Sequence, residues 1–327
     1  MGDHAELRFL PEWLARGYAG ELQYLHESAS LRADVRAVVP GARSVVVLGT
    51  LYNTTPESAP EPVADGVARI ARYARGDDYH DILRARINEL VAWMEQVSPD
   101  PFDARAFVDS GPVQERVYAQ YAGLGWIGKN TCLIHPELGS FLFLSEIICT
   151  LPLEPDTQGL DGCGTCTTCI DACPSGALVE PYVLDATKCV SYLTIELRGG
   201  IDTSLRPAVG AHVFGCDICQ TVCPYNQPPP LSADPSWQAR AALAAPDLAS
   251  LWLHSDEDLR ALTKGTALTR AKIEGLRRNL AVAIGNVGDA DAVAALCTPA
   301  DERPSAETPM VRDHVEWALA QQRLRRD

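Results

Sequence analysis

The chain has 327 residues, a mass of 35.4 kDa, 46% hydrophobic residues and a formal net charge of −15. This length predicts two or three domains, and the hydrophobic fraction is sufficient for buried cores. The acidic balance argues against a protein that coats nucleic acid non-specifically, although it leaves room for a local basic patch. No apolar run approaches the ~20 residues of a membrane span, and the N-terminus lacks a signal-peptide pattern. We therefore expect a cytoplasmic protein without membrane contact, whose thiols stay reduced.

The first half of the sequence alternates between helical and strand patterns. Apolar residues at helical spacing predict two helices, and a third follows a proline: 10–25, 81–98 and 112–121. Short apolar runs between turn residues predict three strands: 44–51, 104–108 and 141–148. Strands that alternate with helices indicate an α/β domain. The order of the strands is left open.

Two turns in this half carry side chains that could take part in catalysis or in cofactor binding. Asp109 and Ser110 follow a strand and precede a helix; helix capping explains that position locally, and catalysis by Asp109 is the alternative. The second turn joins two glycines to Lys129, Asn130 and Thr131, and could bring backbone N–H groups and a cation to a cofactor. It has neither Walker A nor G-x-G-x-x-G spacing, so an ordinary surface turn is the alternative.

The middle of the chain carries eight cysteines in two interlocking sets. The C-x2-C-x2-C-x3-C-P spacing at 163–174 is that of a bacterial ferredoxin, in which three thiolates hold one cubane and the fourth reaches the other cluster. A single cysteine at 189 and a C-x2-C-x3-C-P run at 216–224 follow. Because the chain reverses direction between the two runs, each run supplies ligands to both [4Fe–4S] clusters. One cluster is expected on the first set of cysteines: Cys163, Cys166, Cys169 and Cys223. The other is expected on the second set: Cys173, Cys189, Cys216 and Cys219.

Two other interpretations of these cysteines are weaker. Structural zinc takes four ligands per site, and a run of four cysteines closing with C-P is not its usual spacing. A disulfide framework would need a secretory context. We therefore expect electrons to pass through two clusters. Three cysteines outside the motif are expected to be small buried hydrophobic residues: Cys132, Cys149 and Cys297.

A proline-rich linker after Cys223 precedes a helical region. Helices are expected at four stretches: 247–262, 270–287, 289–296 and 310–319. Residues 277–296, which span the second and third of these, resemble one HEAT-type unit, and 310–319 are a candidate for its partner unit. One short stretch is rich in basic residues: Lys264, Arg270, Lys272, Arg277 and Arg278. These side chains could contact RNA phosphates, and a solvated helix face with ordinary charge mixing is the alternative.

Several motifs, in their order along the chain, resemble those of the epoxyqueuosine reductase family. They are Val108-Asp-Ser-Gly-Pro-Val-Gln-Glu-Arg116, Gly125-Trp-Ile-Gly-Lys-Asn130, Gly139-Ser-Phe-Leu142, both cysteine runs, and Cys189-Val-Ser-Tyr-Leu-Thr-Ile-Glu196 between them. The resemblance implies a multidomain α+β and α/β protein. Its expected parts are a nitroreductase-like cobalamin-binding α/β domain at 1–153, a ferredoxin-like module with two [4Fe–4S] clusters at 154–230, and a C-terminal α-helical HEAT-like domain that contacts tRNA at 231–327. Family members usually carry one more strand and helix before Trp13, so this chain is expected to start late or to lack that strand.

The resemblance also implies a reaction. The family reduces epoxyqueuosine to queuosine at the wobble position of tRNA anticodons, the last step in making queuosine, with cobalamin supplying the difficult chemistry and two clusters relaying electrons. Asp109 matches the family's acid and would protonate the departing oxygen, for which burial should raise its pKa. Seven residues in matching motifs are candidates for corrin contacts: Arg32, Lys129, Asn130, Thr131, Ser140, Tyr192 and Asp217. No Asp-x-His-x-x-Gly motif is present, so a histidine ligand to cobalt is not expected.

The implied partners are a tRNA anticodon stem-loop and an external electron donor such as a flavodoxin or ferredoxin system, with the chain acting as a monomer. The basic stretch would contact phosphates, and a flipped anticodon base would enter the pocket. Two alternatives share part of this plan. A corrinoid reductive dehalogenase usually has an export signal and lacks the helical C-terminal addition. A ferredoxin-type electron carrier predicts iron without cobalt.

Overall fold

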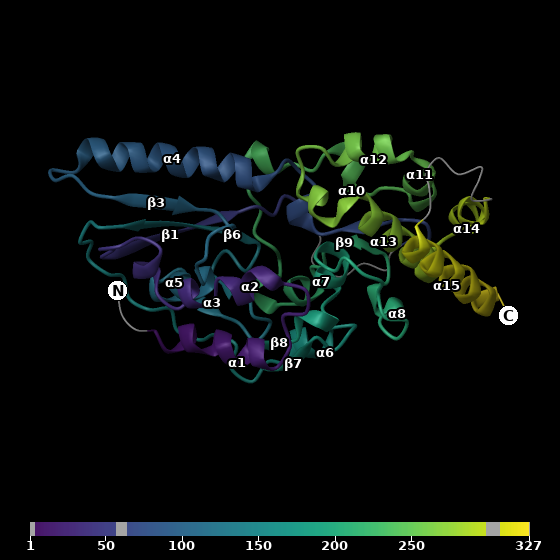
Figure 1. Ribbon diagram of the computed structural model, residues 1–327, viewed down its shortest axis with the longest axis horizontal. Coiled ribbons are helices and arrows are strands. Elements are labelled where there is room, and N and C mark those ends of the chain that lie inside the picture. Colours follow the sequence, from purple (N-terminus) through teal and green to yellow (C-terminus); the bar gives the residue numbers. More distant parts are fainter. Residues whose placement is uncertain (1–3, 57–63, 299–307, 327) are drawn as a thin grey trace.

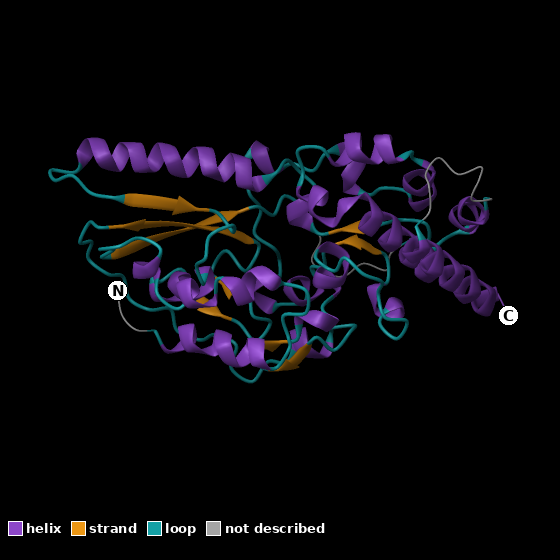
Figure 2. Cartoon of the chain, in the orientation of Figure 1, coloured by secondary structure: helices purple, strands orange, loops and turns teal. Residues whose placement is uncertain are grey.

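The computed structural model describes residues 4–56, 64–298 and 308–326. A three-stranded antiparallel sheet organises the N-terminal half, in the order β1 (Ser44–Leu51), β6 (Leu142–Cys149) and β3 (Ala104–Phe107). Figure 2 shows these strands with helices on both sides. Because β6 is central, its residues have a partner strand on each side, and Glu146 lies opposite both Val47 and Phe107.

Different helices cover the two faces of this sheet (Figure 1). α4 (Tyr79–Val97) packs on one face through Leu83 and Ile87. α5 (Glu115–Tyr121) packs on the other face through Val117. The remaining helices and strands between residues 4 and 150 are short: α1 (Phe9–Ala15), α2 (Gln23–Glu27), α3 (Ala29–Arg32), β2 (Arg69–Ile70), β4 (Trp126–Ile127) and β5 (Leu133–Ile134).

The cysteine-bearing segment is built from short elements joined by loops. They are α6 (Thr168–Asp171), β7 (Leu178–Glu180), β8 (Val183–Leu184), α7 (Val190–Ile195), α8 (Arg206–Val209), β9 (His212–Phe214) and α9 (Ile218–Thr221). α6 and α9, which belong to the two cysteine runs, pack against each other. β9 pairs in parallel with β2, so strand pairing also joins this segment to the N-terminal half.

Helices form the rest of the described chain: α10 (Ala241–Ala244), α11 (Leu248–Leu253), α12 (Asp256–Thr263), α13 (Lys272–Val287), α14 (Ala290–Cys297) and α15 (Pro309–Arg326). α13 is the central one, because it is buried from Gly275 to Gly285 and packs on α11, α14 and α15. The core around α13 includes Ile70 and Phe214, so the C-terminal helices also pack on β2 and β9. None of the described helices is long and apolar enough to cross a membrane.

Most of the expected elements are present, with two differences. The expected helix at 10–25 is divided into α1 and α2, because Gly17 and Gly20 adopt left-handed backbone with φ of 73° and 55°, a conformation that ends helices. The expected helix at 247–262 is divided into α11 and α12. Ser255 begins α12 with a capping box, in which its side chain and that of Asp258 each accept from the other's backbone N–H.

Candidate active site

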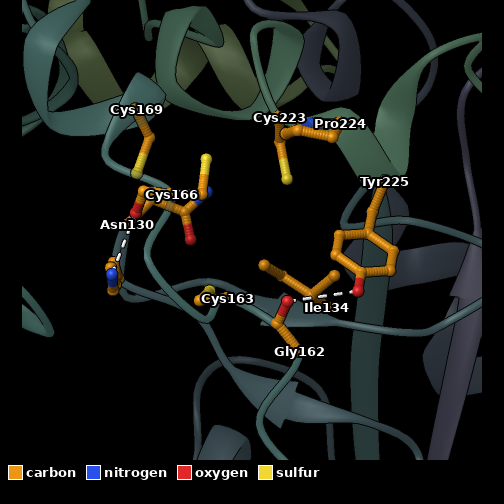
Figure 3. Close-up of a pocket in the computed structure, with 10 residues that line it drawn as sticks. Asn130, Ile134, Gly162, Cys163, Cys166, Cys169, Cys223, Pro224 and Tyr225 are labelled. Carbon is orange, nitrogen blue, oxygen red and sulfur yellow. Dashed lines mark hydrogen bonds between the residues drawn. The ribbon is translucent and has the colours of Figure 1, made fainter.

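Four cysteines of the first set line one cavity, as Figure 3 shows: Cys163, Cys166, Cys169 and Cys223. The cavity has a volume of about 260 Å³. A zinc ion holds its thiolates ~2.3 Å from a single point. This space is instead several times the ~30 Å³ that one water molecule takes in the liquid. The four thiols therefore surround room for a group of several atoms, as a [4Fe–4S] cluster is.

The cysteines of the second set also lie near one another: Cys173, Cys189, Cys216 and Cys219. Burial, helped by the charges of Cys189 and Cys173, raises the pKa of the Cys216 thiol to about 12. Burial also raises the pKa of Cys189. Crowded thiols that resist ionisation alone lose their protons when a metal coordinates them. This donor set fits a second iron–sulfur cluster.

Lys129 and Asn130 hold the loops of both cysteine sets. Lys129 Nζ donates to the carbonyl oxygens of Gly164 at 2.7 Å and Cys166 at 2.9 Å. Asn130 Nδ2 donates to the carbonyl of Cys219 at 3.2 Å. Both side chains are buried. Their polar groups thus fix the cysteine loops, a role that the sequence did not indicate.

Three other expected corrin contacts also bond to protein groups. Ser140 and Tyr192 are buried. The hydroxyl of Tyr192 accepts from the backbone N–H of Glu21 at 2.8 Å, and Tyr192 packs in a core cluster that includes Trp13 of α1. The carboxylate of Asp217 accepts from the backbone N–H of Arg72 at 2.7 Å. These contacts join the N-terminal half to the cysteine segment.

Asp109 follows β3 with a backbone conformation that few residues adopt. Its φ is 55°, and the Ser110 N–H donates to the Val108 carbonyl at 2.5 Å, which closes a three-residue turn around it. Such a turn is rare and strained for a residue with a side chain. The next helix, α5, begins at Glu115 with Gln114 as its N-cap. The capping interpretation is therefore wrong, because a turn separates Asp109 and Ser110 from the helix.

The carboxylate of Asp109 faces two side chains from the start of α4. Its Oδ2 accepts a hydrogen bond from the Tyr79 hydroxyl at 2.8 Å and lies 3.4 Å from His80 Nε2. The other ring nitrogen of His80, Nδ1, lies 2.8 Å from Asp78 Oδ1. Burial lowers the pKa of His80, but hydrogen bonds to Asp109 and Asp78 outweigh it and raise the pKa to about 9. The ring is therefore protonated at neutral pH, with both N–H groups donating.

The pKa of Asp109 moves in the direction opposite to the expected one. The hydrogen bond from His80 lowers it and outweighs burial, and the hydrogen bond from Tyr79 lowers it further. Burial acts in the expected direction, but it is smaller than the effect of the His80 hydrogen bond. At neutral pH Asp109 is a carboxylate, and the proton of the pair is on His80.

Arg116 lies near both Asp109 and Cys132. Its charge contributes to the lowered pKa of Asp109, and its guanidinium donates to the Thr131 carbonyl at 2.5 Å. A hydrogen bond to Cys219, helped by the charge of Arg116, lowers the pKa of Cys132. Cys132 is thus a neighbour of the second set rather than an isolated hydrophobic residue. Of the other two, Cys149 is buried as expected, whereas Cys297 is exposed.

The basic stretch of the C-terminal helices divides into a buried and an exposed part. Arg277 is 4% exposed, donates to the Trp252 carbonyl at 2.6 Å and pairs with Asp256 at 3.1 Å. Arg278 is 1% exposed and donates to the Leu193 carbonyl at 2.5 Å. The prediction that these two arginines contact phosphates is wrong, because their guanidinium groups bond inside the protein.

The exposed part of the basic stretch consists of Lys264, Arg270 and Lys272. Arg270 forms an ion pair with Glu196 at 2.9 Å. Its charge also acts on Tyr24, as does that of Asp109. Arg270 therefore lies on the same side of the molecule as Asp109.

The site contains residues that the sequence analysis missed: Tyr79, His80, Glu115, Arg116 and Glu146. A signal existed for some of them. Asp78-Tyr79-His80 places three titratable groups at the start of a helix. Glu146 is the only charged residue in the strand predicted at 141–148.

Two family models match the sequence. Residues 32–110 match the model described as "Epoxyqueuosine reductase QueG, DUF1730", and residues 162–226 match the "4Fe-4S double cluster binding domain". An epoxyqueuosine reductase of Pseudomonas aeruginosa is 41% identical over 321 residues, which are 98% of this chain and 87% of that protein. This chain belongs to the epoxyqueuosine reductase family. As a member, it is an oxidoreductase whose cysteine segment carries [4Fe–4S] clusters.

Other members of the family agree in sequence and in fold. The Escherichia coli K12 epoxyqueuosine reductase is 38% identical over 320 residues, covering 97% of this chain and 83% of that protein. A crystal structure of an epoxyqueuosine reductase with an epoxyqueuosine-modified tRNA-Tyr stem loop has a TM-score of 0.81 and 31% identity, covering 90% of this chain and 77% of that one. The Bacillus subtilis enzyme, with its catalytic aspartate loop swung out of the active site, has a TM-score of 0.83 and 29% identity, covering 96% and 83%.

Proposed function

We propose that this chain reduces epoxyqueuosine to queuosine at the wobble position of a tRNA anticodon. The observation that carries the proposal is the pair of His80 and Asp109, which holds a proton near Arg116, and Arg116 in turn acts on Cys132 beside the second cysteine set. The chain also belongs to the family named for this reaction. The stem-loop complex of a family member supports tRNA as the substrate. The swung-out aspartate loop in the Bacillus subtilis enzyme supports Asp109, in its strained turn, as the acid.

The reaction opens an epoxide and releases its oxygen as water, which takes two electrons and two protons. His80 Nε2 holds a proton 3.4 Å from Asp109 Oδ2. Transfer of this proton to Oδ2 makes Asp109 a neutral acid that can donate to the departing oxygen. Tyr79 fixes the carboxylate through its hydroxyl, so that Oδ2 stays aligned with the ring. His80 and Asp109 thus act as one donor with a shared proton.

Cobalamin is the cofactor that the family resemblance implies, and we assign it to the region between Asp109 and Cys219. Cobalamin would supply a low-valent cobalt able to break the carbon–oxygen bond. Two strained turns support this assignment, because non-glycine residues with positive φ cluster at functional sites: Asp109 and Thr131 have φ of 55° and 64°, and Arg116 lies near both. Of the seven expected contacts, we retain Arg32 and Thr131, since Arg32 Nη1 donates to the Val113 carbonyl beside the Asp109 turn at 2.8 Å.

The same proposal covers the parts of the chain and its partners. We assign 1–153 to a nitroreductase-like cobalamin-binding domain, 154–230 to the ferredoxin-like module and 231–327 to a HEAT-like domain. The packing of α13 on α14 and α15 supports the last. Lys264, Arg270 and Lys272 would contact tRNA phosphates. The chain would act as a monomer in the cytoplasm, with an external flavodoxin or ferredoxin as electron donor.

Anaerobic reconstitution with iron, sulfide and cobalamin tests the proposal. The loaded chain is given an epoxyqueuosine-bearing tRNA stem-loop and a strong one-electron reductant. We expect iron for two [4Fe–4S] clusters, one cobalt per chain and conversion to queuosine. Iron without cobalt or conversion would instead indicate a ferredoxin-type electron carrier. Dehalogenation of a chlorinated arene without conversion of the stem-loop would indicate a reductive dehalogenase.

A further inference from the structure

Glu146 stands in the middle of the central strand, where a charged residue is unexpected. Its side chain is 0% exposed. It alternates with Leu144 and Ile148, which belong to the core on the α5 face, so it points into that core. Within the described part of the chain, neither of its carboxyl oxygens has a hydrogen-bonding partner of ordinary geometry. An ionised carboxylate is very costly in such a place, so Glu146 requires a proton.

Glu115, the first residue of α5, faces Glu146. Among the described residues its Oε1 is also buried without a partner. Burial, followed by the charge of Asp109, raises the pKa of Glu115 to about 7. Burial, followed by the charge of Glu115, raises the pKa of Glu146 well above its usual range. The other charged group near the pair, Arg116, acts in the opposite direction and only on Glu115. Two carboxyl groups in contact titrate as a unit, and this unit keeps at least one proton at neutral pH.

The pair lies directly behind Asp109. β3 and β6 place Phe107 opposite Glu146, and Asp109 follows Phe107 closely along the chain. The backbone of Asp109 hydrogen-bonds to the Glu115 carboxyl. The turn is held close to the strand, because a Cβ at Gly111 would lie 2.5 Å from the Phe107 ring. The exposed acid and the buried pair therefore share one short loop.

We propose that the Glu115–Glu146 pair is a proton store that reprotonates Asp109 during the reaction. This inference rests on the proposed function, in which an epoxide, two electrons and two protons give an alkene and water. His80 and Asp109 hold the first proton. The second passes from the pair to the Asp109 carboxylate after the first has left with the oxygen, and solvent then returns one proton to His80 and one to the pair. The electrons come from the external one-electron donor. Glu115 and Glu146 act through Asp109, so they are positioning residues.

Infrared spectroscopy of the full chain with its clusters tests for the stored proton. A protonated carboxyl group has a C=O band that shifts when water is exchanged for D2O. We expect such a band below pH 7, and we expect it to weaken as the pH rises through about 7. The Glu115→Gln/Glu146→Gln double variant should lack the band. The control Glu95→Gln, which removes an exposed glutamate of α4, should keep it. A double variant with the wild-type spectrum would overturn the proposal.

Turnover on the modified stem-loop tests the use of the proton. Glu115→Gln should keep its cluster content and KM but lose about tenfold in kcat, which is less than the roughly 10²- to 10⁴-fold of a complete general acid because only the second proton is affected. The fall in wild-type kcat as the pH rises through about 7 should be absent from the variant. Wild-type kcat at every pH in this variant would refute the store while leaving the proposed function intact. Failure of the wild type itself to convert the stem-loop would refute the proposed function, and the infrared result would still decide whether the pair holds a proton.

Discussion

Two sets of titratable groups flank the Asp109 turn and behave in opposite ways. On the α4 side, His80 and Tyr79 donate to Asp109, and its pKa is lowered. On the α5 side, Glu115 and Glu146 have chiefly each other, and the pKa of each is raised. The chemistry of the carboxyl groups is the same, so the difference comes from their neighbours: a protonated ring favours the anion, whereas an apolar core and a second carboxyl oppose it. Asp109 is therefore an ionised carboxylate on the α4 side of the turn, whereas the Glu115–Glu146 pair on the α5 side keeps a proton.

The variant Asp109→Asn removes the carboxylate on the α4 side of the turn, and it should have the largest effect on turnover. We expect turnover on the modified stem-loop to fall by roughly 10²- to 10⁴-fold, because the amide cannot pass a proton to the oxygen. Iron content should not change. The pKa of His80 should fall from about 9, since one of its two carboxylate partners is lost. Single-turnover assays and an NMR titration of the His80 ring measure these effects, and wild-type turnover would remove Asp109 from the reaction.

The variant His80→Gln weakens the same side without removing the acid. Asp109 then loses its strongest hydrogen-bond donor, so its pKa should rise and turnover should fall by about tenfold. His80 has its pKa raised from 6.5 to about 9 in the folded chain. Its stabilising contribution is therefore complete below pH 6.5 and is lost as the pH rises through about 9. Urea unfolding at several pH values should show the wild-type advantage over His80→Gln shrinking across that interval. His26→Gln, at an exposed histidine of α2, is the control and should show no such trend.

The variant Glu146→Gln tests the buried side through stability. Folding raises the pKa of Glu115 from 4.5 to about 7 and that of Glu146 above its usual range. A carboxyl group that keeps its proton on folding makes the protein less stable as the pH rises from the unfolded to the folded pKa. The variant should therefore match the wild type near pH 5 and be more stable by about 1–3 kcal/mol above pH 8. The same difference in unfolding free energy at both pH values would show that the pair does not titrate.

The basic stretch also has an exposed and a buried side, and removing its exposed lysines should have the smallest of the expected effects. The variant Lys264→Gln/Lys272→Gln removes two exposed amines, so it should weaken stem-loop binding several-fold at low salt and reduce the salt dependence by about two phosphate contacts. Its unfolding free energy should not change. Arg84→Gln, at an exposed arginine of α4, serves as the control. Binding titrations at several salt concentrations measure the slope, and an unchanged slope would place the tRNA elsewhere.

Much of the fold could be predicted from local pattern. The run Val45-Val-Val-Leu48 predicted β1, and the stripe of Leu83 and Ile87 predicted α4, because each pattern buries one face in a way that local sequence records. The strand order could not be predicted, since it depends on which strands meet after folding. The cysteine runs predicted iron–sulfur binding from spacing alone.

The site was less accessible to sequence reasoning, because charge pairing acts across distant elements. Nothing local shows that His80 meets Asp109, or that Arg277 and Arg278 turn inward to bond with carbonyl groups. The expected pKa of Asp109 was wrong for this reason: burial was considered without the ring beside it. Glu146 within an apolar strand was the local signal that could have drawn attention to the buried pair.

The two cysteine sets cross in the sequence, and this has a consequence for how the protein is made. Cys216 and Cys219 complete the set that begins with Cys173, and Cys223 completes the set that begins with Cys163. The second iron site cannot be complete until the ribosome has passed Cys219, and the first cannot be complete until it has passed Cys223. Because chains fold from the N-terminus during synthesis, the sheet of β1, β3 and β6 can form while both iron sites still lack ligands. Iron delivery is therefore a late step of biogenesis, and a nascent chain that stalls before Cys216 offers only incomplete, oxidation-prone thiol sets.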